Sequence, residues 1–97
     1  MENITENLKK YLEIIGWKLR FRGCGYYSIL TNRNKITNFE YRDDGILTCN
    51  PAPTKGYKSS GIIYFNLNEC HFEKLDDHAI SIVSNNAKDI FINLYKY

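Results

Sequence analysis

The chain has 97 residues, of which 43% are hydrophobic and 25% charged, with a formal net charge of +2. This length fits a single domain over residues 1–97, and the composition is too apolar for a disordered chain. No apolar run is long enough to span a bilayer, the N-terminus lacks the basic and apolar regions of a signal peptide, and the three cysteines are an odd number without close pairs. The sequence therefore predicts a cytoplasmic protein that does not enter a membrane.

The first predicted element is a helix over residues 4–15. Asn3 followed by Glu6 fits a capping arrangement at its start. Apolar residues then recur at helical spacing, at Ile4, Leu8, Leu12 and Ile15. Gly16 suits the left-handed position that ends a helix, and Trp17 just beyond it is placed to pack back on Leu12.

After Gly16 the period of apolar residues changes from 3.6 to 2, which is typical of strands. We predict strands near residues 17–22, 26–32, 35–42, 45–50, 61–67, 70–75, 79–84 and 89–95. The pattern over residues 74–84 also fits a short helix. Because the connections are short, the strands are expected to pair antiparallel. The predicted fold class is α+β, with a single N-terminal helix packed on a bent antiparallel β-sheet of about six to eight strands.

One segment is unusually basic: residues 14–39 carry five cations and no acid. We call these cations the basic stripe: Lys18, Arg20, Arg22, Arg33 and Lys35. Alternation along residues 17–22 places the first three on one face of a strand, with Trp17, Leu19 and Phe21 on the other. With Tyr26 or Tyr27 as stacking platforms, the stripe is a candidate nucleic-acid site. The alternative is that these cations only solvate the strand and protect its edge.

A second candidate is the loop over residues 50–61, where two prolines and two glycines exclude regular structure. Loops of this length in a small domain are often functional. Its polar side chains suit a phosphate or an acidic protein surface, and the candidate binding residues are Lys55, Tyr57, Lys58 and Ser59. The spacing of a P-loop is absent. The alternative is a solvated connection.

The cysteine and histidine residues give a weaker signal. Cys70, His71 and His78 lie close in sequence, but the two close ligand pairs typical of a zinc site are missing. Cys70 and His78 would also suit a nucleophile and its base, although neither lies in a recognisable nucleophile context. We therefore predict no metal, no cofactor and no catalytic residue.

The aromatic residues complete the functional interpretation. The rings expected in the core are Trp17, Phe21, Phe39, Phe65 and Phe72. Eight tyrosines exceed what such a core needs, and tyrosine is enriched at protein interfaces. Residues 1–60 carry ten cations and six acids, whereas residues 61–97 carry three cations and five acids, so charge itself can steer a partner.

No motif identifies a family, and three functions are carried forward. The first is a small non-enzymatic binding protein that occupies the surface of a partner protein, as inhibitor or immunity-type proteins of phages and mobile elements do. The alternative is direct nucleic-acid binding through residues 18–35. The third is a small-ligand or enzymatic pocket between the helix and the sheet.

Overall fold

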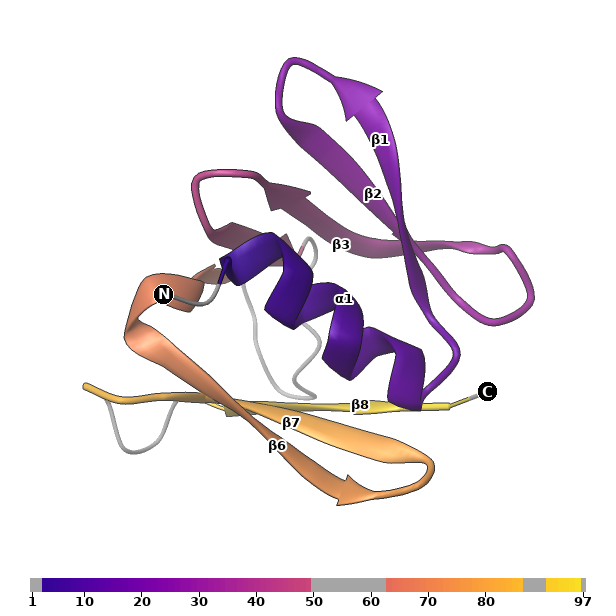
Figure 1. The fold of residues 1–97 in the computed structure, drawn as a ribbon, viewed down its shortest axis with the longest axis vertical. Helices are drawn as coiled ribbons and strands as arrows, with labels where there is room; N and C mark the ends of the chain where they lie inside the picture. The colour runs from indigo at the N-terminus through magenta and orange to yellow at the C-terminus, as the bar shows by residue number, and fades with distance from the viewer. Residues whose placement is uncertain (1–2, 50–62, 87–90, 97) are drawn as a thin grey trace, which may run out of the picture.

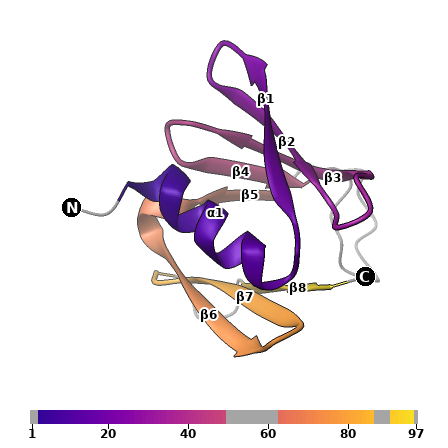
Figure 2. The same cartoon turned by 45° about the vertical axis from the view of Figure 1, so that its right-hand side comes forward.

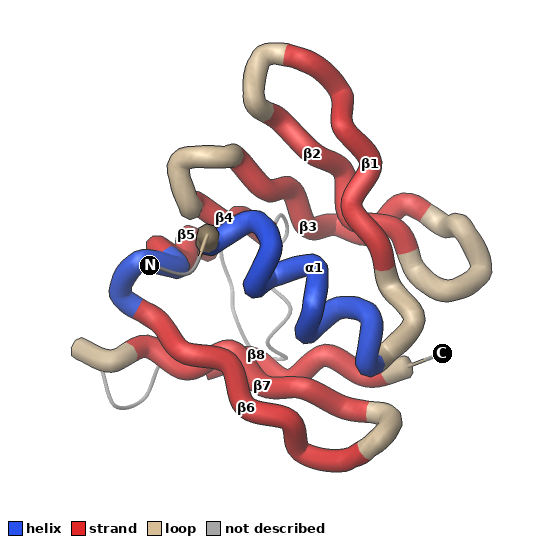
Figure 3. Tube along the Cα trace, viewed as in Figure 1, coloured by secondary structure: helices blue, strands red, loops and turns tan. Residues whose placement is uncertain are grey.

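The computed structural model describes residues 3–49, 63–86 and 91–96, which form one helix and eight antiparallel strands in two sheets (Figure 1). Helix α1 (Ile4–Ile14) is followed by the first sheet: β1 (Lys18–Gly23), β2 (Tyr26–Leu30), β3 (Ile36–Arg42), β4 (Ile46–Cys49) and β5 (Ile63–Asn66). The 3-10 turn η1 (Leu67–Glu69) leads into the second sheet: β6 (Cys70–Asp76), β7 (Ala79–Ser84) and β8 (Phe91–Tyr95). Within each sheet, every strand pairs with its neighbours in sequence (Figure 3). In the part of the chain so described, no helix is long and apolar enough to cross a membrane.

This architecture confirms the predicted α+β class, the N-terminal helix and the antiparallel strands. Residues 74–84 belong to the β6–β7 hairpin and not to a helix. The sequence pattern did not reveal that the strands divide into a five-stranded and a three-stranded sheet. The division falls at η1, which follows β5 directly and ends where β6 begins.

Helix α1 begins and ends as its sequence predicts. The Asn3 side chain caps its start by accepting hydrogen bonds from the backbone N–H of Thr5 at 2.9 Å and of Glu6 at 3.3 Å. At its end, the N–H of Gly16 donates to the carbonyl of Glu13, and that of Trp17 to the carbonyl of Leu12, both at 3.0 Å. These two bonds are the Schellman pattern, and Gly16 adopts the left-handed φ of +75° that it requires.

The helix lies in the angle between the two sheets and packs on both (Figures 1 and 2). It contacts β1 of the first sheet and β6 and β7 of the second. Tyr11 of the helix stacks on Phe72 of β6, with ring centroids 4.9 Å apart. Buried side chains from all three layers form one core, including Leu8 and Leu12 of the helix, Leu47 of β4 and Ile80 of β7.

A row of apolar side chains crosses the helix-facing side of the first sheet. The strand register aligns one residue from each of its five strands, in the order Phe21, Tyr27, Tyr41, Leu47 and Phe65. The ring centroids of Phe21 and Tyr27 lie 5.3 Å apart, and those of Tyr27 and Tyr41 lie 5.7 Å apart. The row therefore joins the buried core to the β1–β2 hairpin.

Phe21, at the outer end of this row, corrects one expectation. Of the five rings predicted to lie in the core, three are buried and Phe72 is half-buried, but Phe21 is 62% exposed. The reason is that the β1–β2 hairpin projects beyond the helix, so nothing in the described structure covers the far end of its apolar face (Figures 1 and 2).

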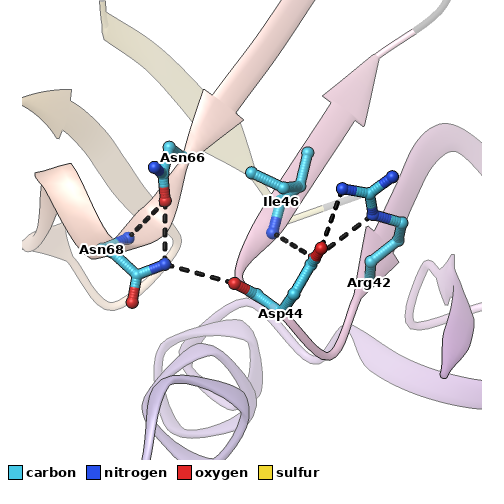
Figure 4. Close-up of polar contacts among 5 residues, drawn as sticks. All are labelled: Arg42, Asp44, Ile46, Asn66 and Asn68. Carbon is cyan, nitrogen blue, oxygen red and sulfur yellow. Dashed lines mark hydrogen bonds and ion pairs between the residues drawn. The ribbon is translucent and has the colours of Figure 1, made fainter.

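Polar contacts connect the β3–β4 turn to the start of the second sheet (Figure 4). Asp44 accepts two hydrogen bonds from the Arg42 guanidinium, at 2.8 and 3.2 Å, and one from the backbone N–H of Ile46 at 3.3 Å. The Asn68 amide donates to the Asp44 carbonyl at 3.2 Å, and Asn66 accepts from both the backbone and the side chain of Asn68. These contacts hold η1, and hence the connection between the sheets, against the turn.

Candidate binding surface on the first sheet

The structure places the three cations of β1 as predicted. Lys18, Arg20 and Arg22 alternate along the strand, and all three are exposed. Their side chains lie on the face opposite the apolar row because successive residues of a strand point to opposite sides. At the usual rise of a strand, the distance from Lys18 to Arg22 is about 13 Å.

The two remaining cations of the basic stripe continue it at one end. Lys18 pairs with Leu30, the last residue of β2, and the turn that carries Arg33 and Lys35 follows directly. Thr31 holds this turn by accepting hydrogen bonds from the backbone N–H groups of Arg33 at 3.2 Å and Lys35 at 3.3 Å. The fold therefore brings all five predicted cations together along β1 and the neighbouring turn.

Four of these five cations keep their charge available for a partner. Arg22 donates a hydrogen bond to Ser28 at 3.3 Å and lies 3.9 Å from the Glu40 carboxylate. Within residues 3–49, 63–86 and 91–96, Lys18, Arg20, Arg33 and Lys35 have no carboxylate within ion-pair distance.

Acidic side chains border the basic stripe on β3 and in the β3–β4 turn. Glu40 lies opposite Ser28 on β3, and Asp43 and Asp44 occupy the turn. The Arg42 hydrogen bonds hold the pKa of Asp44 below its usual range, so this carboxylate is ionised near neutral pH. The positive charge is therefore limited to β1 and the β2–β3 turn and does not extend over the whole face of the sheet.

The two predicted stacking residues lie on opposite faces of β2. Tyr27 is half-buried between the rings of Phe21 and Tyr41 in the apolar row. Tyr26 is 45% exposed and lies opposite Arg42. Tyr26 is therefore the more accessible of the two rings.

The sequence did not indicate that two apolar side chains next in sequence to cations of the basic stripe are exposed. Phe21 is 62% exposed on β1, and Ile36 is 66% exposed at the start of β3, directly after the turn that holds Arg33 and Lys35. Both residues occur in strand-like patterns, which do not show how far the helix extends over the sheet. The loop candidates Lys55, Tyr57, Lys58 and Ser59 lie outside the described residues, and their role stays a prediction.

The Cys70 and His78 pair considered from the sequence does not form. Cys70 pairs with Ser84 at the start of β6, whereas His78 lies in the turn at the other end of the β6–β7 hairpin. His71 lies opposite Val83, and its ring contacts the Asn85 side chain at 2.6 Å, so it also lies far from His78. Burial, with a smaller effect of Glu69, raises the pKa of the Cys70 thiol, which disfavours the nucleophilic thiolate. Among the residues that the structure places, no three His, Cys, Asp or Glu side chains gather as metal ligands.

A cavity of about 440 Å³ lies between the two sheets. Arg42 and Tyr64 line it from the first sheet, and Cys70 and Ser84 from the second. The helix–sheet interface named in the third functional prediction instead contains the fully buried side chains of Leu8, Leu12 and Ile15. A ligand-binding role stays a prediction.

Comparison with known proteins leaves the surface to be interpreted from its chemistry alone. No family model matches the sequence, and no curated protein and no solved structure matches the chain.

Proposed function

We propose that this chain is a small non-enzymatic binding protein that acts by occupying the surface of a partner protein, in the manner of inhibitor or immunity-type proteins of phages and mobile elements. The proposed contact surface is made by β1 and the turns on either side of β2. One observation carries the proposal: along β1 and the β2–β3 turn, exposed cations that have no acidic partner among the described residues are next in sequence to two exposed large apolar side chains, Phe21 and Ile36. Arginine and aromatic residues are the side chains most enriched in the energetic centres of protein interfaces.

The composition of this surface favours a protein partner over a nucleic acid. Ile36 offers an aliphatic surface that suits an apolar protein pocket but no base-stacking role. Glu40, Asp43 and Asp44 lie beside the basic stripe, where a phosphate backbone crossing the sheet would meet like charge. A protein partner accommodates both features because its own surface can supply cations, acids and apolar groups in turn.

The two kinds of side chain are expected to contribute to binding in different ways. Cations at the rim of an interface mainly raise the association rate and select the partner, whereas buried apolar side chains contribute most to retention. The described residues from Leu67 onward carry two cations and four acids, opposite in sign to the basic stripe. This separation of charge would orient the protein as it approaches an acidic partner.

Affinity capture with matched variants tests the proposal. The variant Phe21→Ser with Ile36→Ser removes two exposed apolar groups from the proposed surface. The control, Leu75→Ser with Phe91→Ser, removes two groups of similar exposure from the second sheet. We expect one protein to be retained in stoichiometric amount by the wild type and the control but lost by the first variant. Equal retention by all three proteins would contradict this surface.

Nucleic-acid binding is the second candidate, favoured by the four exposed cations that have no acidic partner within the described part of the chain. Fluorescence anisotropy with labelled single- and double-stranded DNA and RNA, at low and moderate salt, tests it. Binding that falls steeply with salt and disappears in the triple variant Lys18→Ala, Arg20→Ala, Arg22→Ala would place this function first. Absence of binding at low salt would remove it.

A further inference from the structure

We propose that the free edge of β1 accepts an extended segment of the partner as an additional strand, and that this segment alternates acidic and apolar residues. This inference rests on the proposed protein-binding function and specifies the chemistry of the partner. Strand addition is an established mode of recognition in which main-chain hydrogen bonds provide affinity and alternate side chains provide specificity.

The position of β1 provides the edge. In the order β1-β2-β3-β4-β5, β1 is terminal, and β2 is its one strand neighbour among the residues described. Its six residues, Lys18–Gly23, are enough for a short strand pairing, and the hairpin that contains them projects from the domain (Figure 2). In an antiparallel pair, half of the backbone groups of β1 point toward β2 and the other half point outward.

The side chains of β1 specify what an added strand should carry. Lys18, Arg20 and Arg22 lie on one face, and Leu19 and Phe21 lie on the other. Side chains directly across two paired strands are only about 5 Å apart, so a matching strand places acids against the cations and apolar residues against Leu19 and Phe21. The 62% of Phe21 that is exposed would then be covered, and the apolar row of the first sheet would extend by one member.

The same charges argue against a second copy of this chain as the occupant. Pairing two β1 edges would bring the cations of one copy against those of the other, and like charges in that position destabilise a sheet. The arrangement therefore discriminates between partners, because it opposes self-association and favours a strand that carries acids.

A pair of synthetic peptides tests the pattern. The probe is a fluorescein-labelled peptide of eight residues in which Glu and Val alternate, and the control peptide carries the same residues as a Glu block followed by a Val block. At low ionic strength we expect the full-length protein to bind the alternating peptide at least about tenfold more tightly, since only that peptide matches both faces of β1. Equal binding of the two peptides, or no binding of either, would overturn strand addition.

Reversing the charge of one β1 side chain tests whether the peptide binds at this strand. Arg20→Glu should weaken binding of the Glu-Val peptide about tenfold and should confer binding of an alternating Lys-Val peptide. Lys74→Glu is the matched control because Lys74 is also an exposed cation on an edge strand, β6 of the second sheet. If Arg20→Glu prefers the Glu-Val peptide over the Lys-Val peptide as strongly as the wild type does, the proposal is contradicted.

Amide hydrogen exchange separates strand addition from docking by side chains alone. The amides of Lys18–Gly23 that point away from β2 should exchange more slowly when the Glu-Val peptide is bound. If the peptide binds and these amides are not protected, strand addition is wrong while the protein-binding surface stands. Failure of the proposed binding surface would be detected independently in the capture experiment, where the variant Phe21→Ser with Ile36→Ser would then retain the partner as well as the wild type does.

Discussion

At the residue scale, Gly16 and Tyr41 connect the helix to the first sheet in two different ways. Gly16 ends the helix in the left-handed region, and a Cβ atom added there would lie 2.9 Å from the Cβ of Asn32 in the β2–β3 turn. Tyr41 shares a hydrogen bond of 2.7 Å with the Thr5 hydroxyl across the interface between β3 and the helix. The first connection depends on the absence of a side chain and the second on a single pair of hydroxyl groups.

Gly16→Ala is expected to lower the free energy of unfolding by about 1–2 kcal/mol. The left-handed conformation alone costs roughly this amount for a residue with a Cβ atom. The close approach to Asn32 adds to the cost unless the turn moves. Chemical denaturation measures the difference, with Lys10→Ala, an exposed helical substitution, as the control. A change no larger than in the control would show that the helix end is not constrained in this way.

The Thr5–Tyr41 hydrogen bond is expected to contribute about 0.5–1.5 kcal/mol to stability. Tyr41→Phe removes the hydroxyl and keeps the buried ring, and Thr5→Ala removes the other partner. A double-mutant cycle by urea denaturation isolates the coupling between the two residues. Fully additive losses in the double variant would mean that the bond adds nothing beyond the separate side chains. Tyr64→Phe, at an exposed position, is the control for loss of a phenol hydroxyl.

At the element scale, the turn between β3 and β4 joins the first sheet to the beginning of the second. Asp44 takes part through its carboxylate, which binds Arg42, and through its carbonyl, which accepts a hydrogen bond from Asn68. The backbone N–H of Leu67 also donates to the carbonyl of Gly45 at 2.8 Å. This turn is therefore a structural junction as well as a connection between two strands.

The junction should make stability depend on pH in the acid range. The hydrogen bond from Arg42 is the main cause that lowers the pKa of Asp44 from its ordinary 3.8, so the folded state favours the ionised carboxylate. The resulting stability is present above pH 3.8 and is lost as the pH falls through the lower pKa of the folded state. Melting temperatures of wild type and Asp44→Asn should therefore differ near neutral pH and converge in strong acid. A constant difference across the range would contradict this, and Glu13→Gln controls for the loss of one carboxylate.

The predictable elements of this fold are those whose determinants are local. The cap at Asn3, the stop at Gly16 and the alternation along β1 each depend on a few neighbouring residues, and the structure confirms all three. The exposure of Phe21 and Ile36 depends instead on where the helix lies over the sheet, which no local pattern encodes. The cations of the candidate surface could thus be predicted, but the apolar residues beside them could not.

At the scale of the whole molecule, the division into two sheets is the feature least visible in the sequence. Strands β5 and β6 are separated only by η1, a spacing that would equally suit two neighbours in one sheet. The two sheets share the helix as a packing partner, because its apolar side chains contact strands of both, with Tyr11 stacked on Phe72 and Leu8 and Leu12 fully buried. Which strands pack on the same helix depends on contacts between residues far apart in the sequence. The spacing of apolar residues along the chain does not specify these contacts.

The cations of β1 are also expected to keep the whole protein from associating with itself. Replacing Lys18, Arg20 and Arg22 by threonine keeps the strand propensity but removes the repulsion between two β1 edges. We expect this triple variant to form dimers or larger species at concentrations where the wild type is monomeric, as measured by sedimentation velocity. A monomeric triple variant would show that other features protect the edge. Replacement of Lys9, Lys10 and Lys74 by threonine matches the change in net charge.

The position of the helix in the chain has a consequence for the order of folding. The helix is synthesised before every strand, yet one of its apolar sides is covered by β6 and β7, which follow near the end of the sequence. During translation the first sheet can form while that side still faces solvent, and contacts such as Tyr11 with Phe72 close last. A nascent chain that stalls before β6 would therefore expose an apolar helix surface, and such a chain is a natural substrate for chaperones and proteases.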